Sequence, residues 1–192
     1  MAGRGALSCL VLVALMAGSA QAAPRQAPQF PTFFTALGAT PNTNYGKQIV
    51  EALKLQTTLS NPKLALTVFM PEDRYFDGLA KRLNVAPTQM SKNAGLMKQV
   101  LFYHFVTGSS GVRRVFSTPG LRPGMKLDTM YMSTSTKKPY QLAVNAVNGK
   151  LQIRSVGTSA YIIRPNIRCG AGYAHIINNV LVPMRLEQIP RI

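Results

Sequence analysis

The chain has 192 residues, a length that fits one folded domain with a buried core and gives no reason to expect a second domain. It carries 22 Lys and Arg against only 6 Asp and Glu, for a formal net charge of +16. So few carboxylates argue against an enzyme built on acid–base chemistry, while a field of this size attracts polyanions.

Residues 1–22 have the pattern of a secretory signal peptide. Arg4 precedes a run of 12 mostly apolar residues from Ala6 to Ala17, and Ala20-Gln21-Ala22 has the spacing that a signal peptidase cleaves. The run is shorter than the roughly 20 residues of a membrane-spanning helix. A transit peptide, the alternative, would be amphipathic and rich in Arg and Ser. We therefore predict a secreted, extracellular protein, in a matrix or cell wall, whose mature form begins at residue 23.

Apolar spacing predicts the elements of the first half of the chain. After a flexible lead-in at 23–29, apolar residues at helical spacing predict one helix over 30–37, with Pro31 at its first position, and another from about 49 to 60. The short run 64–69 is rich in branched and aromatic residues, so we expect a buried strand that ends before Pro71. Another helix follows at 73–83.

The next segments read as a helix, a strand and loops. Residues 96–101 predict a helix that gives way to a strand at 102–106. Residues 107–131 contain Gly, Pro and Arg, and we expect loops with short extended pieces there.

The last third of the chain has the pattern of β structure. Two alternating segments, 140–147 and 150–156, flank Asn148-Gly149, the strongest short hairpin signal. Two more apolar runs, 160–163 and 174–182, predict strands around a glycine turn at 170–172. Helices that precede strands in this way indicate an α+β fold.

Three strings in this order resemble the fasciclin domain family. Thr67-Val-Phe-Met-Pro-Glu-Asp-Arg-Tyr-Phe76 resembles its first signature box, Tyr103-His104 its central pair, and Gly172-Tyr-Ala-His-Ile-Ile-Asn-Asn-Val-Leu-Val-Pro183 its second box. The resemblance covers residues 30–185 and leaves 186–192 as a C-terminal tail. It implies a wedge with a twisted β-sandwich core flanked by N-terminal helices, and a role in adhesion or matrix assembly.

The resemblance also implies which residues form the core and which meet a partner. The two boxes should pair as adjacent strands, each ended by its proline, with this set of signature residues in or beside the core: Thr67, Val68, Phe69, Pro71, Phe76, His175, Ile176, Val180, Leu181 and Pro183. The adhesion candidates are Tyr103, His104, Asn166 and Ile167. Asn166-Ile167 stands where many members have Asp-Ile, and the lost carboxylate argues against integrin-type recognition.

The reactive side chains also fit structural roles. His104 and His175 are the only histidines, too few for a typical catalytic zinc site, and we expect hydrogen-bonded strand residues at both positions. Once Cys9 leaves with the signal, Cys169 is a lone thiol that we expect to be buried. Glu72 and Asp73 suit a helix start. We predict no cofactor, no metal and no catalytic group.

Three functions remain open at this stage. The first is a non-enzymatic adhesion or matrix-binding module that recognises a cell-surface or matrix protein, an acidic polysaccharide or a glycoprotein. The second is a soluble carrier of polyanionic or anionic-lipid ligands, with Arg113, Arg114, Lys137 and Lys138 as candidate contacts. The third is a hydrolase that uses His175 with a serine or Cys169. We expect no nucleic-acid partner, because no recognition motif appears.

Overall fold

The computed structural model describes residues 28–86, 93–185 and 188, and the predicted signal peptide lies outside them. The helices are α1 (Phe33–Ala39), α2 (Asn44–Ala52), α3 (Gln56–Leu59), α4 (Asp73–Arg82), α6 (Ala94–His104) and the 3₁₀ turn η1 (Thr118–Gly120). The strands are β1 (Gln29–Phe30), β2 (Thr67–Pro71), β3 (Phe105–Ser109), β4 (Val112–Arg113), β5 (Lys126–Met132), β6 (Pro139–Val147), β7 (Lys150–Arg154), β8 (Ser159–Cys169) and β9 (Gly172–Ile177).

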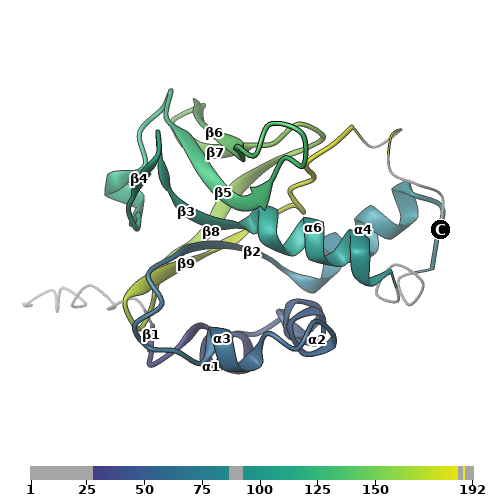
Figure 1. Ribbon diagram of the computed structural model, residues 1–192, viewed down its shortest axis with the longest axis horizontal. Helices are drawn as coiled ribbons and strands as arrows, with labels where there is room; N and C mark the ends of the chain where they lie inside the picture. Colours follow the sequence, from purple (N-terminus) through teal and green to yellow (C-terminus); the bar gives the residue numbers. More distant parts are fainter. Residues whose placement is uncertain (1–27, 87–92, 186–187, 189–192) are drawn as a thin grey trace, which may run out of the picture.

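All strands join one curved sheet, in the order β1-β8-β7-β6-β5-β3-β2-β9, with β4 beside β3 and a further β8–β9 pairing. Helices α1 to α3 cover one side of β2 and β9, and α6 lies against the sheet next to β5 (Figure 1). The α-helices precede β3 and most strands follow it, so the chain is α+β as expected. No helix among residues 28–86 and 93–185 is long and apolar enough to span a membrane.

The expected helix at 30–37 begins later than predicted. Phe30 is in β1, paired with Cys169 of β8, and Gln29, which we placed in the flexible lead-in, belongs to the same strand. Thr32 caps α1 through a reciprocal pair of bonds with Thr35, at 3.2 and 3.1 Å. Pro31 therefore stands before the cap and not at the first helical position.

The single helix expected from 49 to 60 is two helices, α2 and α3. Lys54 has a φ of 56° between them, a left-handed conformation that ends an α-helix. The strand expected at 64–69 is shifted to Thr67–Pro71, with Pro71 as its last residue. Helix α4 matches the predicted segment.

One helix–strand boundary and one loop in the middle of the chain were predicted wrongly. The strand predicted at 102–106 starts only at Phe105, because α6 continues to His104. Both elements are buried there, so hydrophobicity gives no signal of the change. Residues 107–131, where we expected loops with only short extended pieces, contain all but the last residue of β5, a seven-residue strand between β3 and β6.

The predicted hairpin is present. Asn148 and Gly149 have φ values of 51° and 73°, and Val147 pairs with Lys150 on either side of them. The strand predicted at 160–163 is part of the longer β8.

The second signature box forms a strand only in its first half. Strand β9 ends at Ile177, so Pro183 does not end a strand as predicted. Asn178 and Asn179 redirect the chain: the Asn178 side chain accepts from Tyr161 N at 2.7 Å, and the Asn179 side chain accepts from Val180 N at 3.0 Å. The residues after the strand are still buried, with Val180, Leu181 and Val182 inside the core.

The two boxes lie side by side where both are strands. Strands β2 and β9 pair in parallel from Thr67↔Tyr173 to Pro71↔Ile177. Val68 and Ile176 face the core beneath α1 to α3, whereas Phe69 faces a second core to which strands β3 and β5 to β8 contribute. A third core under α4 and α6 contains Phe76 and Val180. The two boxes thus contribute side chains to all three hydrophobic cores.

Candidate functional site

His104 joins the end of α6 to the second box. Its Nδ1 lies 2.7 Å from the Val100 carbonyl and donates to it, and its Nε2 accepts from Leu181 N at 3.0 Å. This assignment requires a neutral ring with the proton on Nδ1. Burial lowers the pKa of His104 to about 4, which agrees with that state. Both ring nitrogens are therefore used in hydrogen bonds within the fold.

Tyr103 is equally inaccessible. Its ring is fully buried and meets Tyr131 and Tyr140 edge-on, with centroids 6.4 Å away in each case. Its hydroxyl donates to the Gln141 carbonyl at 3.2 Å, and burial raises the pKa of Tyr103 to about 12. Neither member of the Tyr-His pair reaches the surface to meet a partner.

His175 bridges β9 to two other segments. Its Nε2 donates to the Phe116 carbonyl at 2.9 Å, and its Nδ1 accepts from Asn166 N at 3.2 Å. The ring stacks on Phe69 with centroids 5.7 Å apart, and burial lowers its pKa. A fully buried imidazole with both nitrogens occupied offers no site for proton transfer to a substrate.

Asn166 occupies an irregularity in β8, with a φ of 61°. Its Oδ1 accepts from Thr118 N and its Nδ2 donates to Thr118 Oγ1, both at 2.8 Å. Asn tolerates the left-handed conformation better than most residues. The neighbouring Ile167 is buried beneath α1. The Asn-Ile dipeptide thus fixes a loop and fills the core.

These contacts converge on one short segment, 116–118. Thr67 of the first box accepts from Phe116 N at 2.7 Å, His175 of the second box bonds the Phe116 carbonyl, and Asn166 holds Thr118. We call these five residues the signature network. Thr67, Asn166 and His175 were identified from the sequence. Phe116 and Thr118 were missed, because no pattern in the predicted loop indicates that these two residues bond to the other three.

A family model for the fasciclin domain matches residues 41–183. The chain belongs to the fasciclin domain family. Fasciclin domains are adhesion modules, typically extracellular or at the cell surface and generally without enzymatic activity. No curated protein matches the sequence.

A solved structure has the same fold as this fasciclin domain: the FAS1 domain pair from the insect cell adhesion molecule fasciclin I. The TM-score is 0.65 at 17% sequence identity, and the match covers 80% of this chain and 51% of the other. The chain therefore spans about half the length of that domain pair. At this identity the likeness shows the fold alone.

The described carboxylates of this fasciclin domain are all used internally. Glu72 is buried and pairs with Arg74 at 2.8 Å and Arg164 at 3.0 Å, and Asp128 accepts from Gly111 N and Gln141 Nε2. Asp73 accepts from the backbone of Asn44 and Tyr45, and Asp77 accepts from the Tyr45 hydroxyl. Glu51 pairs with Lys47 one turn earlier in α2. The pairing of Glu72 with Arg164 joins residues 92 apart and has no sequence signal.

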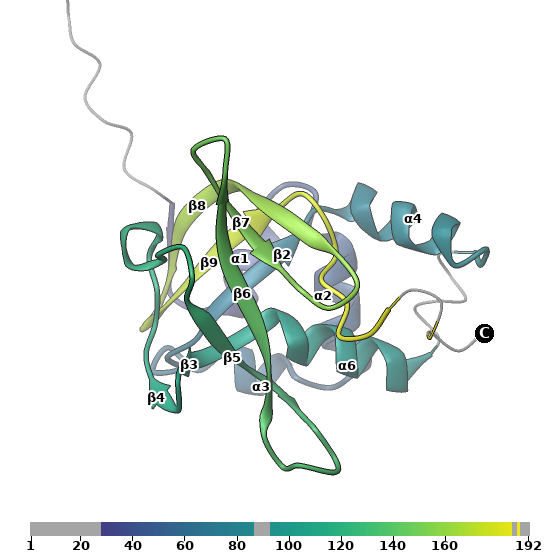
Figure 2. The same ribbon diagram turned by 90° about the horizontal axis from the view of Figure 1, so that it is seen from above.

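The cations remain in excess on the surface. Of the Lys and Arg that the structure describes, only Lys47, Arg74 and Arg164 have an ion pair. Arg113 and Arg114 are exposed and line a groove together with Lys63. Lys137 and Lys138 are exposed in the turn between β5 and β6, which lies away from β4 (Figure 2). The two predicted pairs thus belong to different segments of the surface.

The described residues hold no cluster of metal ligands. No group of three His, Cys, Asp or Glu side chains within residues 28–86 and 93–185 could hold a metal ion. Cys169 is buried, and burial raises the pKa of its thiol to about 12. At neutral pH this sulfur is a small apolar core atom.

Proposed function

We propose that this protein is an extracellular, non-enzymatic adhesion module that binds an acidic matrix component through its basic surface. The observation that carries the proposal is the division of charge: the described carboxylates bond within the fold, while most Lys and Arg face solvent without a partner. An unneutralised cationic surface concentrates polyanions near it. The signal-peptide pattern of residues 1–22 supports an extracellular location, and so does the typical location of fasciclin domains.

The reactive side chains support a binding role over a hydrolase. His175, the proposed catalytic base of that alternative, bonds through both nitrogens inside the core, and Cys169 holds its proton. His104 is neutral and bonds through both nitrogens as well. A hydrolase needs a base within reach of its nucleophile and substrate.

The carrier alternative has less support than the adhesion module. The cavity beneath α1 and α6 has a volume of about 30 Å³, which is on the scale of water molecules and not of a lipid chain. It cannot hold an acyl chain. Anionic lipid would therefore have to bind to the same surface cations as any other polyanion.

Retention on an immobilised polyanion tests the proposal. The mature domain should bind heparin or polygalacturonate resin at low salt and elute in moderate NaCl, because screening weakens attraction between exposed charges. Reversing both Arg113-Arg114 and Lys137-Lys138 to Glu should shift elution to lower salt without lowering the melting temperature, since all four side chains are exposed. Unchanged retention after both reversals, or no retention of the wild type, would refute the proposal.

A further inference from the structure

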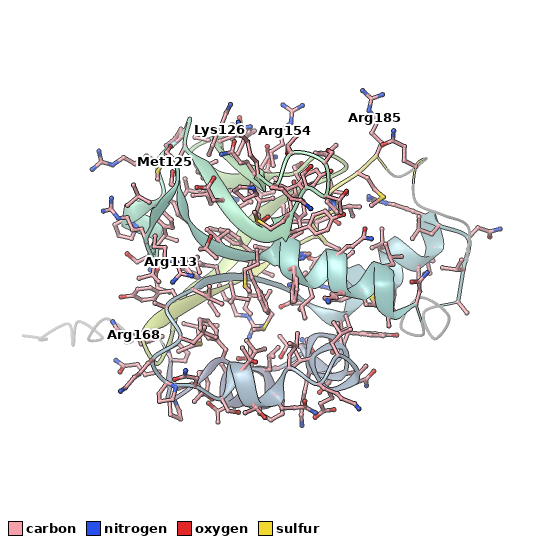
Figure 3. All side chains as sticks on the ribbon, viewed as in Figure 1. Arg113, Met125, Lys126, Arg154, Arg168 and Arg185 are labelled. Carbon is pink, nitrogen blue, oxygen red and sulfur yellow. The ribbon has the colours of Figure 1, made fainter. Side chains whose placement is uncertain are left out.

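A surface groove of about 610 Å³ lies between two segments that are far apart in sequence. One wall is formed by residues 61–66, which lead into β2, and the other by residues 113–115, which begin in β4. Thr107 and Met130 also line the groove. Arg113 marks the position of the groove at the β4 end of the molecule (Figure 3). We call this feature the β4 groove.

The groove exists because two segments share one edge of β3. Strand β2 pairs with β3 only at Val106 and Phe105, and β4 takes the next positions along β3, through Gly108↔Arg113 and Ser109↔Val112. The segment before β2 is therefore separated from β3. The bond from Phe116 N to Thr67 Oγ1 ties the two walls together. The groove is thus a built feature of the sheet edge.

Its lining combines positive charge with an aliphatic floor. Lys63, Arg113 and Arg114 contribute three cations, and the lining contains no carboxylate. Leu64 and Met130 are partly buried and pack against the core beneath α1 to α3, which fixes their positions. The guanidinium of Arg114 lies 5.8 Å from the centroid of the Phe116 ring, which restricts that side chain too.

One residue of the groove also has backbone groups without a partner in the protein. Ala65 is exposed and lines the groove, and neither its N–H nor its C=O bonds to any residue in the part of the chain that the structure describes. These groups are available to the backbone of an incoming extended chain, which is how a strand adds to the edge of a sheet.

We propose that the β4 groove binds an extended peptide segment of a partner protein in which acidic residues alternate with apolar ones. Such a segment places carboxylates near Lys63, Arg113 and Arg114 and apolar side chains on Leu64 and Met130, and it offers main-chain groups to Ala65. A polysaccharide would instead lay hydroxyl groups on the aliphatic floor, where they lose water without gaining hydrogen bonds. The inference rests on the proposed function and names its partner class.

Fluorescence anisotropy with three short labelled probes tests the proposal. A peptide of alternating Glu and Leu should bind at least tenfold more tightly than one of alternating Glu and Ser, and more tightly than a heparin-derived oligosaccharide. The Ser peptide has the same charge and length, so the difference isolates the apolar floor.

Matched variants then separate the groove from the general field. R113E/R114E should weaken binding of the Glu-Leu peptide at least tenfold. K126E/R154E makes the same change of charge on exposed residues away from the groove, at the top of Figure 3, and should weaken it less than threefold. Ala65→Trp leaves the charge unchanged and obstructs the groove, so it should abolish peptide binding while heparin retention persists.

Three results would overturn the inference: equal losses for the two charge-reversal variants, equal affinity for the Glu-Leu and Glu-Ser peptides, or tighter binding of the oligosaccharide at the groove. Each leaves the proposed function standing if the wild type is still retained on heparin. Loss of that retention would remove both proposals together. Thermal melts of every variant establish that the fold is intact.

Discussion

At the scale of single residues, the signature side chains act as cross-links. His104 connects α6 to Leu181, 77 residues away, and His175 connects β9 to Phe116, 59 residues away. Each ring uses one nitrogen as a donor and the other as an acceptor, a combination that a neutral imidazole supplies in one rigid plane. A buried polar group without such partners would destabilise the fold. These hydrogen bonds therefore offset the cost of burying two histidines.

Asn166 provides a test of this structural role. Asn166→Ala should lower the free energy of unfolding by about 2–3 kcal/mol, because it removes two bonds to Thr118 and because alanine tolerates the left-handed conformation less well than asparagine. Asn166→Asp should cost less than about 1 kcal/mol, since a carboxylate can accept from both Thr118 N–H and O–H. Urea unfolding measures both. A large loss with Asp would show that the amide donor is essential.

His104 makes stability depend on pH. Because burial lowers its folded-state pKa to about 4, against about 6.5 when unfolded, the unfolded state binds more protons as the pH falls through this window. Above pH 7, His104 should not lower the free energy of unfolding. Between pH 7 and pH 5 this residue alone should lower it by about 2 kcal/mol, with His175 acting in the same direction. Urea unfolding at each pH measures it.

The variant His104→Gln gives the control for this pH dependence. Gln can donate to Val100 and accept from Leu181 but does not titrate. Its free energy of unfolding will be lower at pH 7, and its slope between pH 7 and pH 5 should be shallower than that of the wild type. An unchanged slope would mean that the titrating group is another residue.

The sequence located these residues but not their orientation. The motif strings identified Tyr103-His104 and Asn166-Ile167 as adhesion candidates, and the structure places three of these side chains in the core and the fourth in an internal hydrogen-bond network. A string specifies residue types, whereas burial depends on where α6 ends and on the irregularity in β8. Neither feature has a periodic signal in the sequence.

At the scale of elements, the carboxylate of Asp73 joins α4 to the start of α2. Asp73, the first residue of α4, accepts from the backbone N–H of Asn44 at 3.1 Å and of Tyr45 at 2.8 Å, at the N-terminus of α2. The side chain thereby satisfies two N–H groups that have no partner within the helix and places a negative charge at the positive end of its dipole.

Asp73→Ala should therefore lower the free energy of unfolding by about 1–2 kcal/mol. Asp77→Ala is the matched control: it removes the same charge one turn along α4 but only a 3.2 Å side-chain bond with Tyr45 Oη. It should cost less than about 1 kcal/mol. Equal losses measured by urea unfolding would assign the effect to charge on α4 and not to capping of α2.

Elements were predictable where local chemistry decides them. The β6–β7 hairpin followed from two residues that tolerate positive φ, and α4 from its apolar spacing. Strand β5 was missed because Gly and Pro precede it and because its pairing with β3 and β6 leaves no local signal in the segment that leads to it. The end of β9 at Ile177 depends on side-chain bonds of Asn178 and Asn179, which hydrophobicity does not report.

At the scale of the whole molecule, the charge is arranged by sign. The described carboxylates accept from helix N-termini, pair with Arg or Lys side chains or bond to turns, so they contribute to the fold. Most cations contribute to the surface potential instead, and loss of residues 1–22 would leave a formal charge of +15. This surplus favours binding of polyanions, but it also makes the folded surface repel itself.

The self-repulsion predicts an unusual response to salt. Raising NaCl from low concentration to physiological ionic strength shortens the Debye length to about 8 Å and screens the exposed cations, so the melting temperature should rise by about 3–5 °C. K126E/R154E lowers the net charge by four, and it should melt higher than the wild type at low salt and respond less to NaCl. A scanning calorimeter measures both. A flat response in the wild type would mean that the surface charges are too dispersed to repel, which would also weaken the case for polyanion binding.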